Sequence, residues 1–392
     1  MKKLIVCILS LLMLIEGFGK INLCAMNDSS LHALSAVIID GENGRVLYSK
    51  DGDTIRPMAS TTKIMTLIIA LEYGNCEDII TVSAYAARMP DVQLGISENE
   101  QYKLEDLMYS MMLESHNDSA VAIAEHIGGS VEGFANMMNQ KAMELGLTST
   151  YFITPNGLDA KNEGGVHATT AKELARIMKY CIKDSEKKDA FIRICQTRQY
   201  SFEEYSGKRS FTVYNKNAFL DMEEGVLAGK TGFTADAGYC YVCAVERDGK
   251  TLIIALLGCG WPNNKGYKWK DTRALLEYAG TAFCYRGLIG TETELPDVSV
   301  ENAIEKERTS LHIKDEYSAL ISENDNVEIL FDIPKSIDAP VCKNEEVGTL
   351  VLKINNEEVW TTSVYISEDV MENTYKYHVN KIFDCFIKCA VQ

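Results

Sequence analysis

The stretch Pro57-Met58-Ala59-Ser60-Thr61-Thr62-Lys63-Ile64-Met65-Thr66 decides how this chain of 392 residues is interpreted. It contains an S-x-x-K pattern, Ser60 to Lys63, at the start of an apolar segment with helical character. Residues three apart share one face of a helix, so this spacing puts the Ser60 hydroxyl beside the Lys63 amine. A desolvated lysine there can accept the proton of a nucleophilic serine. The pattern therefore predicts a Ser60 nucleophile and a Lys63 general base.

A second short motif, Ser115-His116-Asn117, lies between two segments with helical periodicity. At a junction between helices, side chains can point into a cleft. There the Ser115 hydroxyl can relay a proton and the Asn117 amide can hold an amide group of a substrate. Further matches to the two patterns lie in acidic or charged segments that read as turns or solvated helix ends, at 97–99, 185–188 and 322–324.

A third motif, Lys230-Thr231-Gly232, lies in a predicted strand that continues through Phe233. A strand beside a nucleophile can pair with an extended peptide substrate through main-chain hydrogen bonds. Gly232 has no side chain to block that approach, and Lys230 with Thr231 can hold a carboxylate. The order S-x-x-K, S-x-N, K-T-G is far more specific than any single motif, and it characterises β-lactamases and penicillin-binding proteins.

Along nearly its whole length the chain resembles the low-molecular-mass penicillin-binding proteins, the serine-type D-alanyl-D-alanine carboxypeptidases. The resemblance extends beyond the three motifs to the segments 113–120, 138–142, 156–159 and 237–240. It implies an α/β (α+β) transpeptidase fold, in which an antiparallel sheet carries a helical subdomain, followed by a small all-β domain. The expected class is therefore a serine hydrolase that binds penicillin covalently.

The resemblance also implies an acyl-enzyme mechanism on peptidoglycan stem peptides that end in D-Ala-D-Ala. Ser60 would attack the carbonyl between the two D-alanines while Lys63 takes its proton, and Ser115 with Lys230 would pass a proton to the departing D-alanine. The backbone N–H groups of Ser60 and Phe233 would form the oxyanion hole. β-Lactams would acylate the same serine, and no metal or other cofactor is implied.

Binding of the substrate carboxylate is assigned by resemblance to Thr231 and to a cation from a short Asn-rich segment. In this chain that cation is Lys216, where an arginine is common in the family. A lysine keeps the charge and loses the fork geometry of a guanidinium. His116 is a second departure, because a small residue is common at the centre of S-x-N. It could narrow the cleft or change the pH profile.

Two other enzyme and binding classes compete with this interpretation. A β-lactamase would share the acyl-enzyme step and would hydrolyse the acyl group quickly. A penicillin-binding sensor or structural wall-binding protein would have no turnover. The complete set of motif side chains argues against the sensor, and the rate of penicillin turnover separates the carboxypeptidase from the β-lactamase.

Hydrophobic periodicity predicts the elements around the motifs. A hairpin is expected over 34–49, helices from 60 to about 184, strands near 225–229, 239–245 and 251–257, and a helix over 269–283. Strands at both ends with helices between suit one sheet covered by helices. The expected domains are a signal peptide at 1–25, a catalytic domain at 30–290, a small β-sandwich at 295–369 and an amphipathic helix at 372–392.

The two ends of the chain predict its location. Two lysines precede an apolar run over 4–15 that is too short to span a bilayer and suits a signal peptide, although Cys24 leaves a lipid-modified or uncleaved anchor as an alternative. From Val379 on, apolar residues recur at helical spacing among lysines. That pattern favours a helix lying in a membrane interface over one docked on the protein. We expect export to the outer face of the cytoplasmic membrane or the cell wall.

Charge and cysteine content narrow the partners. The chain carries a net charge of -17. Loss of 1–25 with its three lysines and one glutamate would make this -19, which argues against a nucleic-acid partner. The 12 cysteines are scattered through apparent core strands, which suggests mostly reduced thiols. Cys240 and Cys243 read as buried structural residues of a strand rather than zinc ligands. His167 is expected to cap or orient the helix that follows it.

Overall fold

The computed structural model describes residues 26–304 and 307–390, so the predicted signal peptide lies outside the described residues. The described residues form two compact units, the first ending at Ala282 and the second beginning at Phe283. Each unit has its own hydrophobic core.

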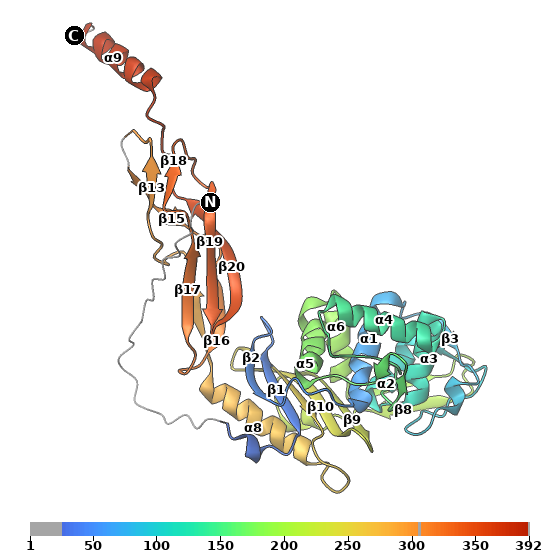
Figure 1. The fold of residues 1–392 in the computed structure, drawn as a ribbon. Coiled ribbons are helices and arrows are strands. Elements are labelled where there is room, and N and C mark those ends of the chain that lie inside the picture. Colours follow the sequence, from blue (N-terminus) through green and yellow to red (C-terminus); the bar gives the residue numbers. More distant parts are fainter. Residues whose placement is uncertain (1–25, 305–306, 391–392) are drawn as a thin grey trace. The chain divides into compact units, whose positions relative to one another are not determined.

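An antiparallel sheet of five strands, in the order β2-β1-β11-β10-β9, forms the base of the first unit (Figure 1). Its strands are β1 (Ser35–Asp40), β2 (Val46–Lys50), β9 (Val226–Thr234), β10 (Gly238–Arg247) and β11 (Lys250–Leu257). The side chains of β1 are buried along its whole length, because helices pack on the sheet. The hairpin and the three later strands confirm the sequence prediction, and the chain between them supplies the helices.

Helices fill the interval between β2 and β9, as the periodicity predicts. They are α1 (Lys63–Tyr73), α2 (Leu104–Leu113), α3 (Asn117–Gly128), α4 (Val131–Glu144), α5 (Ala171–Lys179), α6 (Lys188–Gln196) and the short α7 (Phe219–Met222). After the sheet, α8 (Tyr267–Ala282) packs on β10 and β11. Helix α1 is buried from Lys63 to Leu71 and most of its side chains are apolar, so it forms the centre of the helical part.

Two short hairpins lie among the helices. One joins β3 (Ile79–Thr81) to β4 (Gln101–Lys103), and the other joins β7 (Gln199–Glu203) to β8 (Ser210–Tyr214). The loop at 89–96 belongs to the connection between β3 and β4, and it follows the short helix η3 (Ala86–Arg88). This loop and the second hairpin are joined by polar contacts that are described below.

The second unit is an all-β domain with a terminal helix. Its strands are β12 (Cys284–Ile289), β13 (Val298–Glu301), β14 (Arg308–Thr309), β15 (Leu311–His312), β16 (Tyr317–Ile321), β17 (Val327–Asp332), β18 (Ser336–Asp338), β19 (Glu346–Ile354) and β20 (Glu357–Ile366). Strand β12 pairs with β16, so the second unit starts before the expected boundary at 290. Helix α9 (Tyr375–Ala390) follows β20.

Nine cysteines have side chains that the structure describes, and all nine are free thiols. Cys240 and Cys243 are both buried on β10, where residues three apart point to opposite faces. Burial raises the pKa of each thiol to about 12, which keeps both in the unreactive protonated form. They serve as small apolar core residues.

Candidate active site

The Ser60 hydroxyl lies beside the Lys63 amine at the point where a 3-10 turn, η2 (Ala59–Thr62), leads into α1. Lys63 Nζ is 2.9 Å from Ser60 Oγ, 2.9 Å from Asn117 Oδ1 and 2.6 Å from the backbone oxygen of Asn156. The lysine side chain is fully buried. The structure therefore confirms the predicted proximity of Ser60 and Lys63 and adds two oxygen partners.

The surroundings of Lys63 favour its neutral form. Burial, with a smaller contribution from the charge of Lys230, lowers the pKa of the Lys63 amine well below its ordinary value, and the more distant Asp118 only partly opposes this. A neutral amine has two N–H donors and one lone pair. The oxygens of Asn117 and Asn156 can only accept, so they take the two donors. The lone pair then faces Ser60, which is the arrangement a general base requires.

Lys230 and Ser115, from the other two motifs, are in direct contact. Lys230 Nζ donates to Ser115 Oγ at 3.0 Å and to the backbone oxygen of Thr231 at 3.1 Å. Burial lowers the pKa of Lys230 to about 8. Ser115 has φ of 70°, a left-handed conformation that is unusual for a non-glycine residue, at the junction of α2 and α3. This turn directs its hydroxyl to Lys230.

Gly232 lets the edge strand β9 approach the turn η2, which carries Ser60. A Cβ at this position would lie 2.9 Å from the backbone nitrogen of Ser60 and 3.0 Å from Ala59 Cβ. The missing side chain therefore makes room for the backbone of η2, in addition to the substrate approach that the sequence predicts. The close approach brings the neighbouring Phe233 near Ser60, as an oxyanion hole formed by their two backbone nitrogens requires.

His167 supports the turn η2, which carries Ser60, and does not cap the following helix. Its Nδ1 accepts from the backbone nitrogen of Ile153 at 2.9 Å, so Nε2 carries the proton that faces Thr62 Oγ1 at 2.8 Å. Burial and the neighbouring Lys63 lower the pKa of His167 to about 4, which keeps the imidazole neutral. The cap of α5 is Thr170. The expected role of His167 is thus corrected: it holds η2 through Thr62.

Lys216 lies at the rim of the site, beside the turn that carries Ser115. Its Nζ is 3.3 Å from Glu114 Oε1, which also accepts from the backbone nitrogen of Tyr214 at 2.9 Å. His116 Nε2 is 3.5 Å from the second oxygen of Glu114. His116 is buried, and burial lowers its pKa. Lys216, the predicted substrate-binding cation, therefore lies near the site, but it is paired with the carboxylate of Glu114.

Two parts of the site were missed as functional residues. Asn156 contributes a backbone carbonyl, which no side-chain pattern in the sequence can reveal. The neighbouring Gly157 could have pointed to it, because its φ of 86° and its close approach to Ala59 require glycine. Pro90 and Val92 also act through carbonyls, which accept from Asn117 Nδ2 at 3.1 Å and Asn117 N at 2.7 Å. Within the described residues, no group of His, Cys, Asp and Glu side chains is placed to hold a metal ion.

We predict that Gly232→Ala slows acylation of Ser60 by a fluorescent penicillin by about a hundredfold, the cost of one misplaced oxyanion donor. The added methyl group would press on the Ser60 nitrogen and move β9 outward. Gly280→Ala is the matched control, since a Cβ there meets no atom within 4 Å. Unchanged acylation kinetics in Gly232→Ala would contradict this role for the close approach.

Comparisons with known proteins agree with this geometry. Residues 23–260 match the peptidase S11 family, described as D-alanyl-D-alanine carboxypeptidase, and residues 294–372 match the C-terminal domain of penicillin-binding protein 5. The chain is 29% identical to D-alanyl-D-alanine carboxypeptidase DacF of Bacillus subtilis, over 94% of this chain and 95% of the relative. It is 27% identical to DacA of Haemophilus influenzae, over 87% and 86% of the two chains.

The fold is also that of solved structures. Penicillin-binding protein 5 from Haemophilus influenzae superposes with a TM-score of 0.68 at 24% identity, covering 87% of this chain and 98% of that one. DacD from Francisella tularensis gives 0.69 at 22% identity, covering 91% and 97%. Both share the transpeptidase-like fold followed by an all-β domain. The chain therefore belongs to the peptidase S11 family of serine-type D-alanyl-D-alanine carboxypeptidases, low-molecular-mass penicillin-binding proteins that act on peptidoglycan.

Proposed function

We propose that Ser60 is the nucleophile that removes the terminal D-alanine from peptidoglycan stem peptides ending in D-Ala-D-Ala. The observation that carries the proposal is the three-way environment of Lys63. Two acceptors fix its donors, and its third contact is the Ser60 hydroxyl. The lone pair of the neutral Lys63 amine therefore points toward Ser60 Oγ, so Ser60 is the group from which this lysine can accept a proton.

Acylation begins when the Ser60 proton moves to Lys63 Nζ as the Oγ–C bond forms to the D-Ala-D-Ala carbonyl. The negative charge on the carbonyl oxygen faces the backbone N–H groups of Ser60 and Phe233. The C–N bond to the terminal D-alanine then breaks, and its nitrogen takes the proton that Ser60 gave to Lys63, passed on through Ser115, which is hydrogen-bonded to Lys230. Lys63 is neutral again after this transfer. Water attacks the acyl carbon in the second half of the cycle, which releases the shortened peptide and restores the serine.

Substrate recognition is assigned to the strand and to two cations. The peptide would add to the edge of β9, with the carboxylate held by Thr231 and Lys230. Lys216 lies 3.3 Å from Glu114 and has a largely exposed side chain, so it can exchange this partner for the substrate carboxylate. Asn117, whose Oδ1 faces Lys63, would contact a substrate amide as well.

The test is release of free D-alanine from a synthetic D-Ala-D-Ala peptide. We expect the wild-type chain to release it and Ser60→Ala to lose activity by at least about a thousandfold, since no acyl-enzyme can form. Circular dichroism would check that the variant is folded. With penicillin, we expect a burst of one acylation per chain and little steady turnover. Rapid penicillin turnover would favour a β-lactamase, and acylation without D-alanine release would favour a sensor.

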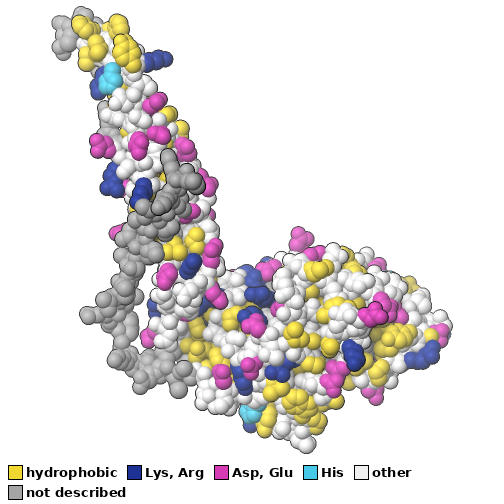
Figure 2. Space-filling model, viewed as in Figure 1, with side chains coloured by type: hydrophobic (Ala, Val, Ile, Leu, Met, Phe, Trp, Pro, Cys, Tyr) yellow, Lys and Arg dark blue, Asp and Glu magenta, His cyan; other side chains and the backbone are white. Residues whose placement is uncertain are grey.

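Export and membrane attachment are also proposed, with α9 as the anchor. Exposed apolar side chains gather on this terminal helix (Figure 2). Ile382, Phe383, Phe386 and Ile387 are each 57 to 72% exposed. Lysines at 376 and 381 supply positive charge on the same helix, which suits an anionic lipid surface. No helix in residues 26–304 or 307–390 has the length and apolar character needed to cross a membrane.

We predict that truncation after Glu372 abolishes binding to vesicles containing anionic phospholipid and leaves D-alanine release unchanged. A full-length variant with Phe383→Asp and Phe386→Asp should lose most of the binding, because each charge opposes burial of the apolar face. Substitution of the exposed Tyr375 near the helix start serves as the comparison. Vesicle binding that survives both changes would rule out α9 as the anchor.

A further inference from the structure

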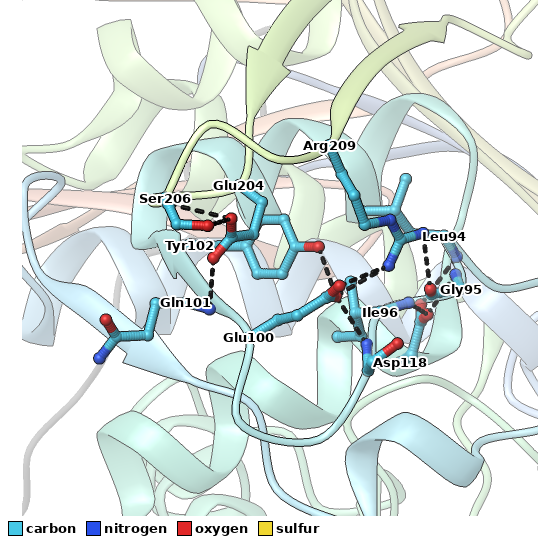
Figure 3. A network of polar contacts seen from close by, with 11 residues as sticks. Leu94, Gly95, Ile96, Glu100, Gln101, Tyr102, Asp118, Glu204, Ser206 and Arg209 are labelled. Carbon is cyan, nitrogen blue, oxygen red and sulfur yellow. Dashed lines mark hydrogen bonds and ion pairs between the residues drawn. The ribbon is translucent and has the colours of Figure 1, made fainter.

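A polar network joins the β7–β8 hairpin to the loop at 89–96 and to the start of α3 (Figure 3). We propose that Arg209, at the tip of that hairpin, is a positioning residue. Its hydrogen bonds fix the loop, and the loop in turn keeps the Asn117 side chain in contact with Lys63. The proposal rests on the acyl-enzyme function above and deepens it, because Arg209 itself would touch neither substrate nor the reacting atoms.

Arg209 forms hydrogen bonds to the side chain of Glu100 and to the backbone of Gly95. Arg209 Nη1 lies 2.8 Å from each carboxylate oxygen of Glu100, and its Nη2 donates to the backbone oxygen of Gly95 at 3.0 Å. Glu100 is fixed in turn, since Oε2 accepts from the Tyr102 hydroxyl at 2.8 Å and from the backbone nitrogen of Ser97 at 2.7 Å. A planar guanidinium can bind the Glu100 carboxylate and the Gly95 carbonyl at the same time, and a lysine would lose part of these hydrogen bonds.

Asp118 continues the network from the loop to helix α3. One carboxylate oxygen accepts from Leu94 N at 3.0 Å, and the other accepts from Gly95 N at 2.8 Å and Ile96 N at 3.3 Å. Figure 3 shows Asp118 on one side of the loop at Gly95 and Arg209 on the other. The loop backbone is therefore gripped at Gly95 through both its N–H and its carbonyl.

The loop passes this restraint to the catalytic lysine. Its carbonyls at Pro90 and Val92 accept from the side-chain and backbone nitrogens of Asn117. With Nδ2 bound in this way, the amide must turn Oδ1 toward Lys63, at 2.9 Å. Val92 is 53% exposed, so little packing holds the carbonyl end of the loop in place. Loss of Arg209 would leave the loop at Gly95 held by Asp118 alone. The carbonyls at Pro90 and Val92 would then hold the Asn117 amide less firmly, and Oδ1 would face Lys63 for a smaller share of the time.

A purely structural role makes a different prediction from a positioning role. If Arg209 only stabilised the fold, its removal would lower the fraction of active molecules and leave each active molecule unchanged. If it positions Asn117, every folded molecule would acylate more slowly, while binding along β9 would be largely kept. Rates must therefore be expressed per active site, titrated with a fluorescent β-lactam to completion.

The experiment compares Arg209→Gln with the full-length wild-type chain. We expect the acylation rate and kcat for D-alanine release, per titrated site, to fall three- to tenfold or somewhat more, the usual range for coupling through such a network. KM should change less than twofold, and Arg209→Lys should recover part of the loss. Arg247→Gln is the matched control, since Arg247 is similarly exposed and pairs with Glu223 at 3.3 Å, away from the loop.

A second variant and the wild-type chain keep the outcomes distinct. Glu100→Gln should slow acylation in the same way, and the double variant should be no slower than the worse single one, because both act through one contact. Unchanged rates per site in Arg209→Gln, or additive losses in the double variant, would overturn the proposal. Absence of D-alanine release from the wild-type chain would instead count against the proposed function.

Discussion

The rest of the site depends on the burial of Lys63 without a directly bonded carboxylate. A charged lysine in such a place is costly, because nothing at hydrogen-bond distance carries the compensating charge. The protein avoids that cost by favouring the neutral amine. Most side chains of α1 are apolar and buried, and this packing keeps water away from Lys63 at the start of the helix. The packing that forms the core therefore also favours the neutral form of Lys63.

Several distant segments have to meet for this to work. The turn η2 supplies Ser60 and the start of α1 supplies Lys63. The α2–α3 junction supplies Ser115 and Asn117, and β9 supplies Lys230. Each junction relies on an unusual backbone feature, such as the left-handed Ser115 or the missing Cβ at Gly232. These features cost conformational energy locally and are stabilised by the surrounding core. Function and fold therefore share the same close contacts.

The sequence predicted the parts that act through side chains in local patterns. Ser60 and Lys63 could be paired because helix geometry fixes their spacing, and β9 could be recognised from its composition. The partners that depend on tertiary structure could not. Asn156 acts through a carbonyl that any residue possesses, and Arg209 meets Gly95 across more than a hundred residues of sequence. Strand β12 was not predicted, because its partner β16 is distant in sequence and its short sequence lacks a clear alternation of apolar and polar residues.

The protonation state of Lys63 tests the account most directly. In protein labelled with [15N]lysine, the Nζ signal of Lys63 can be followed with pH, assigned by its loss in Lys63→Arg and separated from Lys230 by Lys230→Arg. We expect the Lys63 amine to lose its proton well below the ordinary pKa of a lysine, with acylation lost as the pH falls and the amine regains that proton. A Lys63 that stays charged at pH 7 and titrates near its ordinary pKa of 10.5 would contradict it.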